Sequence, residues 1–196
     1  MSGRKDRLVL KFGGTSMADP DRIARSAAIA AAEARKGRAV AVVVSAMAGE
    51  TDRLLSCAQA LGGGLGEVET DTALAAGEQA SAALMALALK AEGLKAEAVM
   101  GWSLPIHVDG PPGASRITAI AGKGLEALVE AGVIPVVAGY QGLSGQGRLA
   151  TLGRGGTDLT AVAVAAALGA ECDIYTDVDG VFTTDPRIEP GARRVE

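Results

Sequence analysis

Short apolar runs that alternate with helical segments are the feature of this chain that most constrains its fold. Each run has the length of a strand and is apolar enough to be covered on both faces; the four clearest are residues 8–12, 39–46, 133–138 and 172–178. The segments between them have helical composition. Such alternation is typical of a parallel sheet with helices on both faces. We therefore predict an α/β fold, a three-layer α-β-α sandwich with a mostly parallel central sheet, in one domain over residues 1–196.

Local signals place the helices more closely. Asp19 and Pro20 predict a helix start, with an N-cap followed by proline at the first helical position. Helices are also expected over residues 51–61 and 70–92, both packed on the sheet. Residues 118–131 have helical composition as well, and residues 142–148 are typical of a glycine-rich turn.

Composition and charge argue against several classes of function. The 19 Lys and Arg against 23 Asp and Glu give a net charge of -4, and no basic stripe with aromatic residues occurs, so we expect no nucleic-acid partner. No apolar stretch reaches the roughly 20 residues of a membrane-spanning helix, so no membrane partner is expected. Cys57 and Cys172 lie too far apart in sequence to suggest a metal or disulfide framework. We expect a cytoplasmic location.

The segment KFGGTS, residues 11–16, follows the first predicted strand and precedes a helix. Gly13 and Gly14 would let backbone N–H groups approach an anion, while Lys11 supplies a full positive charge. The segment therefore predicts a phosphate site, although a tight structural turn with a solvated lysine has the same local pattern. It is not a Walker A loop, because G-x-x-x-x-G-K-[ST] occurs nowhere.

A second glycine-rich loop, residues 151–158, also precedes a helix. Arg154 lies among its glycines, and a guanidinium is well suited to hold a carboxylate through two parallel hydrogen bonds. Asp158 could serve the same site, or could only cap the helix. The nearby glycines of residues 145–150 lead toward a strand and make no convincing dinucleotide motif.

Glu78 lies in a helix that is otherwise strongly apolar. A buried acid is costly unless it is paired, so this carboxylate needs a cationic partner. A substrate ammonium would serve, and so would an internal lysine or arginine.

Six blocks in this order resemble the aspartate kinases: KFGGTS (11–16), VVVSAMAGETD (42–52), GEQASAAL (77–84), VVAGYQG (136–142), TLGRGGTDLTAVAVAAALGA (151–170) and IYTDVDGVFTTDPR (174–187). A further block, GWSLPIHVDG at 101–110, is similar to bacterial members. The resemblance implies the amino-acid kinase fold, ATP with Mg²⁺ as phosphoryl donor and L-aspartate as acceptor. It also implies the product 4-phospho-L-aspartate, a place in lysine, threonine and methionine biosynthesis, and a homo-oligomer.

The resemblance also assigns roles by motif position. Catalysis would fall to Lys11, which contacts the transferred phosphoryl group, and to Asp158, which organises Lys11 and the metal-phosphate region. The substrate side would be formed by Ser45, which also lines the phosphate path, together with Thr51, Glu78 and Arg154. The nucleotide side would be formed by Lys11, Gly13, Gly14, Thr176, Asp177, Phe182 and Arg187. No residue is assigned as a protein ligand of a metal.

The residue types in this sequence fit the chemistry of phosphoryl transfer to a carboxylate. A side-chain carboxylate with a pKa of about 4 is ionised at pH 7, so this nucleophile needs no general base. What the reaction needs is neutralisation of phosphate charge and in-line positioning. His107, the single histidine, is therefore expected to be a strand residue without a catalytic role.

Three departures from the family pattern stand out. Leu159 takes the place of a hydroxyl residue after the double glycine, and Phe182 takes the place of a tyrosine. The family continues through a segment with a lysine that reaches ATP and on to ACT domains, which this chain is expected to lack. Two other hypotheses stay open: another amino-acid kinase, or a catalytically silent aspartate-binding or regulatory module of the same fold.

Overall fold

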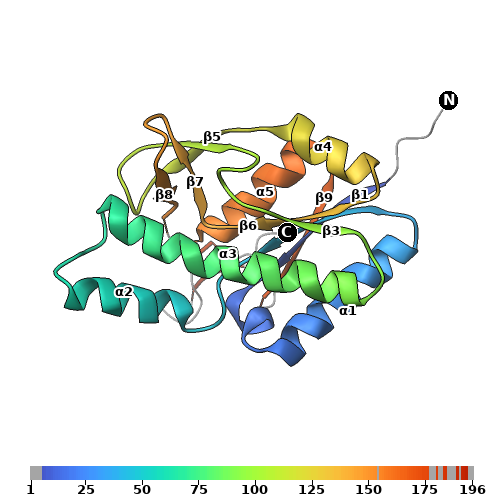
Figure 1. Ribbon diagram of the computed structural model, residues 1–196, viewed down its shortest axis with the longest axis horizontal. Coiled ribbons are helices and arrows are strands. Elements are labelled where there is room, and N and C mark those ends of the chain that lie inside the picture. Colours follow the sequence, from blue (N-terminus) through green and yellow to red (C-terminus); the bar gives the residue numbers. More distant parts are fainter. Residues whose placement is uncertain are drawn as a thin grey trace.

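A five-stranded parallel sheet forms the centre of the molecule (Figure 1). The computed structural model describes residues 6–153, 155–176, 180, 183–184, 189 and 191–193. The strand order is β3-β6-β2-β1-β9, and every pairing is parallel. The bounds are β1 Arg7–Phe12, β2 Ala39–Val44, β3 Ala96–Val99, β6 Ile134–Ala138 and β9 Glu171–Tyr175. The predicted fold class is confirmed.

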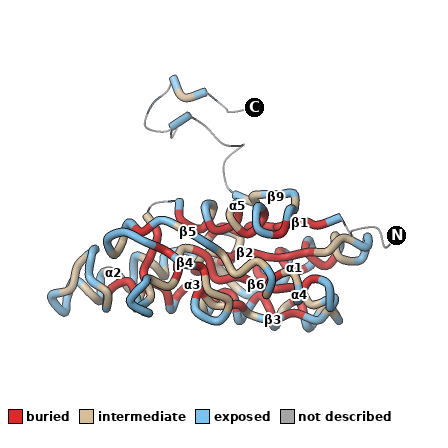
Figure 2. Tube along the Cα trace, turned by 90° about the horizontal axis from the view of Figure 1, so that it is seen from above, coloured by how far each residue is buried: buried red, intermediate tan, exposed pale blue. Residues whose placement is uncertain are grey.

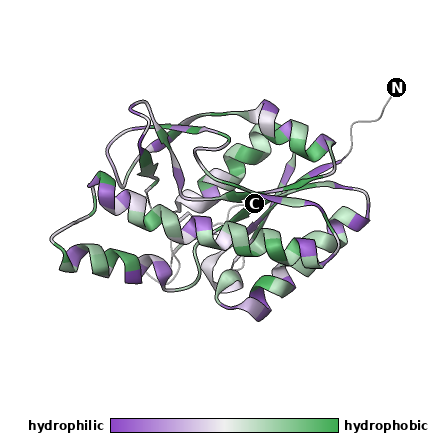
Figure 3. Ribbon diagram, viewed as in Figure 1, coloured by the Kyte–Doolittle hydropathy of each residue, from purple (hydrophilic) through white to green (hydrophobic). Residues whose placement is uncertain are grey.

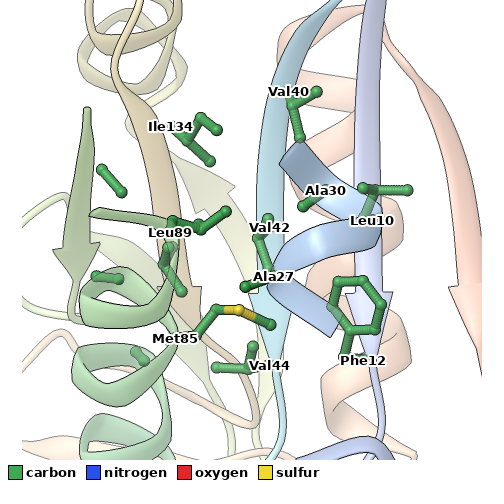
Figure 4. Close-up of a cluster of buried hydrophobic side chains, with 14 of the residues drawn as sticks. Leu10, Phe12, Ala27, Ala30, Val40, Val42, Val44, Met85, Leu89 and Ile134 are labelled. Carbon is green, nitrogen blue, oxygen red and sulfur yellow. The ribbon is translucent and has the colours of Figure 1, made fainter. Parts of the chain in front are cut away.

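Helices cover both faces of this sheet and make the three layers. α1 (Pro20–Arg35) and α3 (Val68–Ala91) pack on one face, and α4 (Gly122–Glu130) and α5 (Gly156–Leu168) on the other. Figure 4 shows how Ala27 of α1 and Met85 of α3 meet Val42 at the first face. Alanine on the inner side of α1 lets that helix approach the strands closely. Each fully buried Val, Leu or Met contributes roughly 1.5–3 kcal/mol to folding.

The start of α1 forms as its sequence predicts. The Asp19 carboxylate accepts a hydrogen bond of 2.8 Å from the backbone N–H of Arg22, and Pro20 is the first helical residue. A single turn of 3-10 helix, η1 (Gly14–Met17), joins β1 to this cap. The chain therefore turns sharply at the carboxyl end of β1, where ligands of open α/β sheets bind.

A second sheet of four strands was not expected from the sequence. Its order is β5-β4-β7-β8, with β4 Ile106–Asp109, β5 Arg116–Ile120, β7 Gln141–Ser144 and β8 Leu149–Thr151. The predicted glycine-rich turn is thus a hairpin, and the helix predicted from residue 118 begins only at Gly122. Pairing of β5 with β4 prevails over local helix propensity. His107 lies in β4 with an exposed side chain, in agreement with its predicted place in a strand.

Helix α2 (Glu50–Ala60) does not pack on the sheet, so that prediction was wrong. None of its residues is buried, and it packs on α3 instead. Figure 2 shows it as a mostly tan and pale blue segment at the left end of the molecule. The face of the sheet on that side is already covered by α1 and α3, which leaves α2 in an outer position.

Helix α3 connects the parts of the molecule. Among the described residues it is the one helix long and apolar enough to cross a membrane by length and composition, and Figure 3 shows its predominantly hydrophobic colouring. It packs against the central sheet, α1, α2 and β8, so its apolar sides match its place in the core. Two buried carboxylates, Asp71 and Glu78, interrupt this apolar character.

Candidate active site

A pocket of about 400 Å³ opens at the carboxyl ends of β1 and β2. It gathers residues from five separate parts of the sequence, which are the KFGGTS segment, the stretch after β2, helix α3, the residues that follow β6 and the start of α5. Its lining comprises Lys11, Gly14, Ser45, Ala46, Met47, Ala48, Gly49, Thr51, Asp52, Glu78, Tyr140, Gly155, Gly156, Thr157 and Asp158. Six of the predicted site residues are therefore brought together: Lys11, Gly14, Ser45, Thr51, Glu78 and Asp158.

Lys11 projects from β1 into this pocket and is 7% exposed. Its Nζ lies 2.7 Å from Oδ1 of Asp158. A solvated surface lysine is thus excluded, and the charge of Lys11 is held by a carboxylate in the first turn of α5. The N-cap of α5 is Gly155, and no side chain caps the helix. Asp158 therefore acts on Lys11 rather than as a helix cap.

The two glycines after β1 keep the backbone close to its neighbours. A Cβ atom on Gly13 would lie 3.3 Å from Nζ of Lys11, and one on Gly14 would lie 3.1 Å from the carbonyl oxygen of Ala46. The N–H of Gly13 donates to the carbonyl of Tyr175 at 3.2 Å. Gly13 therefore contributes close approach rather than a free amide, whereas Gly14 lines the pocket directly.

Glu78 lines the pocket from α3 and is 3% exposed. Burial raises the pKa of its carboxyl to about 8, although a hydrogen bond with the backbone of Ala46 and the charge of Lys11 oppose the shift. Within the described residues its Oε2 has no hydrogen-bond partner, and no ion pair reaches it. A buried acceptor without a partner is costly, so this oxygen is available to a cation that enters the pocket.

The stretch after β2 forms another wall. The N–H of Ser45 donates to the carbonyl of Phe12 at 3.1 Å, which ties this stretch to the end of β1. Gly49, with φ of +79°, turns the chain into α2, and Thr51 follows in the first turn of that helix. The N-terminus of α2 carries partial positive charge and borders the pocket, which favours an anionic ligand group here.

Tyr140 lines the pocket but was missed at the level of sequence. Among the described residues it is the one non-glycine residue with positive φ, at 63°. Its N–H donates to Oγ1 of Thr160 at 3.2 Å, and its carbonyl accepts from the N–H of Leu152 at 2.9 Å. Such a backbone persists only where its surroundings hold it, and it often marks a functional site. No residue pattern in the sequence predicts the positive φ of Tyr140.

The predicted nucleotide side is covered only in part. Thr176 follows β9 and is not among the residues that line the pocket. Arg154, Asp177, Phe182 and Arg187 lie outside the described residues, so their roles stay predictions. Within the described part of the chain, no group of three or more His, Cys, Asp or Glu side chains could hold a metal ion.

Comparison with known proteins gives one consistent result. The sequence profile of the amino acid kinase family matches residues 6–196. Aspartokinase 2 of Bacillus subtilis is 47% identical over 190 residues, which cover 96% of this chain and 47% of that protein. The aspartokinase of Rickettsia felis is 44% identical over 194 residues, 96% of this chain and 48% of that protein. The chain thus spans about half the length of the curated relatives it matches.

A solved structure agrees with the sequence matches. Escherichia coli aspartokinase III in complex with aspartate and ADP superposes with a TM-score of 0.79 at 28% identity, over 97% of this chain and 54% of that one. Three observations support the same family: the sheet order, the pocket at the strand ends and the profile match over nearly the whole length. The chain belongs to the amino acid kinase family.

Proposed function

We propose that this chain carries the kinase site of an aspartate kinase, which transfers the γ-phosphoryl group of ATP to the side-chain carboxylate of L-aspartate and forms 4-phospho-L-aspartate. The names of the relatives support this reading, and so does the neighbour solved with aspartate and ADP. The observation that carries it is a single pocket that holds a buried lysine paired with a half-exposed carboxylate, and a separate buried carboxylate with an oxygen that has no partner among the described residues.

The Oε2 atom of Glu78, which has no partner among the described residues, suits the ammonium group of an amino acid. Glu78 is held mostly neutral at pH 7 by burial, and an ammonium at Oε2 would favour its ionised form. Binding would then release a proton from Glu78 and replace a costly buried acid with a charge-assisted hydrogen bond. Glu78 thereby provides a physical reason for the site to select an amino acid over a simple dicarboxylate.

Lys11 would neutralise charge on the phosphoryl group during transfer. Its Nζ retains donors beyond the bond to Asp158, and the absence of a Cβ at Gly13, which would lie 3.3 Å from Nζ, leaves room for phosphate oxygens beside it. Asp158 holds the ammonium of Lys11 in place. The substrate carboxylate is already ionised at neutral pH, so no general base is required of this pocket.

The remaining assignments extend this proposal. Mg²⁺ would enter as the complex with ATP, and Arg154 would hold a carboxylate of aspartate. Thr176, Asp177, Phe182 and Arg187 would border the nucleotide. We also propose that residues 1–196 form one kinase domain, that the protein is cytoplasmic and homo-oligomeric, and that its product feeds lysine, threonine and methionine biosynthesis.

A coupled ADP-release assay tests the proposal. MgATP is supplied with L-aspartate, L-glutamate or no acceptor, and hydroxylamine traps any acyl phosphate as a hydroxamate. Turnover and hydroxamate that depend on L-aspartate are the expected result. Turnover with another acceptor would reassign the substrate, whereas aspartate binding without turnover would identify a catalytically silent aspartate-binding module.

A further inference from the structure

Asp71 is a second buried acid on α3, and it does not line the pocket. It is 0% exposed. Its Oδ2 accepts hydrogen bonds from the backbone N–H groups of Gly113 at 3.0 Å and Thr151 at 2.7 Å. Its Oδ1 accepts from the hydroxyl of Thr151 at 2.8 Å. This carboxylate is therefore saturated by donors from two distant segments of the chain.

These donors have no other partner in the described structure for clear topological reasons. Thr151 ends β8, an edge strand of the second sheet, where the carbonyl of Thr151 accepts from the N–H of Ser115 at 3.2 Å and the N–H of Thr151 is left to Asp71. Gly113 belongs to the loop between β4 and β5 and has φ of +76°. A Cβ atom at Gly113 would lie 3.3 Å from the backbone N of Gly66, so the loop lies tightly against the start of α3.

Thr151 is also the first residue of the glycine-rich loop that reaches the pocket. Directly after it, the N–H of Leu152 donates to the carbonyl of Tyr140, a pocket residue. The loop then closes on itself through a 2.9 Å bond from the N–H of Gly156 to the carbonyl of Gly153. It ends at Asp158, which pairs with Lys11. Asp71 is thus one of the groups that hold the start of this loop, together with Ser115, whose N–H donates to the carbonyl of Thr151 at 3.2 Å.

The same helix carries the opposite wall of the pocket. Glu78 follows Asp71 by seven residues, which is about two helical turns, so the two carboxylates lie on the same side of α3 roughly 10 Å apart. Asp71 therefore ties the helix that bears Glu78 to the loop that bears Asp158. This link therefore connects the two walls of the pocket.

We propose that Asp71 is a positioning residue of the site, which acts through Thr151 to fix the glycine-rich loop relative to α3. Its predicted effect on turnover rests on the proposed function, whereas its effect on the loop does not. Loss of the carboxylate would free the N–H of Thr151 and let the loop move away from Glu78. Misplacement of reacting groups by about 1 Å can lower rates on the order of 100-fold.

Two substitutions separate positioning from simple loss of packing. Asp71→Ala removes all three acceptor contacts. Asp71→Asn retains one oxygen for the two backbone N–H groups, and its amide can donate to the hydroxyl of Thr151, which then acts as acceptor. The control is Arg7→Met, because Arg7 is also buried and donates to the carbonyl of Leu168 and to Glu126, each at 2.8 Å, yet does not line the pocket.

The experiment combines residue-resolved amide hydrogen exchange with steady-state kinetics on the whole chain. In Asp71→Ala we expect the amides of Leu152 and Gly156 to exchange at least about tenfold faster than in Arg7→Met, after correction for global stability. We expect the KM for L-aspartate to rise about tenfold or more, with a smaller change in the KM for ATP. Asp71→Asn should restore most of both properties.

Unchanged protection of Leu152 and Gly156 in Asp71→Ala would overturn the inference, and so would an equal loss in Arg7→Met. If Asp71→Ala fails to fold, the milder Thr151→Val takes its place, because it removes the hydroxyl contact alone. The exchange rates of the Leu152 and Gly156 amides in that variant then test the inference. A wild-type chain without aspartate-dependent turnover would refute the proposed function instead. Hydrogen exchange would still decide the role of Asp71 in that case.

Discussion

Helix α3 carries two buried carboxylates that differ in how their oxygens are satisfied. Asp71 accepts three hydrogen bonds from Gly113 and Thr151. Glu78, on the same side of the helix, has an oxygen without a partner in the described structure, and burial raises the pKa of its carboxyl to about 8. A saturated carboxylate stabilises the fold that surrounds it, whereas an unsaturated one costs stability until a ligand completes it. Burial alone therefore does not identify a binding residue, whereas a missing partner on a buried group that lines a pocket makes Glu78 a candidate.

The largest expected effect is a loss of turnover when Lys11, in the pocket that Glu78 faces, is replaced. Lys11→Ala should lower kcat by about 1,000-fold, because the charge that neutralises the phosphoryl group is removed. Steady-state kinetics with MgATP and L-aspartate would measure it, with circular dichroism as the control for folding. Turnover close to that of the wild type would remove Lys11 from the catalytic role.

The two carboxylates should have opposite effects on stability when they are removed. Asp71→Ala should lower the free energy of unfolding by about 3 kcal/mol, since two buried backbone N–H groups and a hydroxyl lose their acceptor. At pH 9, Glu78→Gln should leave the free energy of unfolding unchanged or raise it. At that pH the carboxyl of the wild type is ionised and its Oε2 has no partner among the described residues. Urea unfolding of both variants at this pH provides the measurement. Destabilisation of similar size in both would erase the distinction.

The stability of the wild type should also depend on pH through Glu78. Its folded pKa of about 8 lies above the unfolded value near 4.5, so the stability that the neutral form contributes is complete below pH 4.5 and is lost as pH rises through 8. Relative to Glu78→Gln, the free energy of unfolding should fall by about 2 kcal/mol between pH 6 and 8 and level off above. Parallel curves for the two proteins would show that Glu78 is ionised in the folded state throughout.

The smallest expected effect sharpens the account of Asp71. Thr151→Val retains the side-chain shape and the backbone N–H bond but removes the hydroxyl that donates to Oδ1 of Asp71. Unfolding should become easier by about 1 kcal/mol, the usual cost of one lost hydrogen bond. Chemical denaturation at pH 7 would measure this change. A loss as large as that in Asp71→Ala would mean that the backbone bonds contribute little.

Much of the fold and part of the site could be predicted from the sequence because the relevant signals are local. The strand that bears Lys11, the cap at Asp19 and the apolar surroundings of Glu78 are all visible within a few residues. The hairpin of β7 and β8 was missed because short strands with glycine resemble turns. Helix α2 has helical composition wherever it packs, so its outer position could not be deduced.

Asp71 and Tyr140 were missed for a different reason. In sequence, Asp71 is an acid in the first turn of a helix, which is a common solvated position. Its structural role depends on hydrogen bonds from Thr151, which lies 80 residues away in the sequence. Tyr140 is set apart by its positive φ, which is a property of the folded backbone rather than of the residue type. Contacts distant in sequence and strained dihedral angles become visible only in the structure.

The most direct test of the distinction between the two carboxylates compares two ligands. L-Aspartate and succinate share both carboxylates and differ by the ammonium group, and calorimetry can measure the affinity of each for the wild type, Glu78→Gln and Asp71→Asn. We expect the wild type and Asp71→Asn to prefer aspartate by at least about tenfold, and Glu78→Gln to lose most of this preference. A Glu78→Gln variant that discriminates as well as the wild type would contradict the assignment of Glu78 to the ammonium.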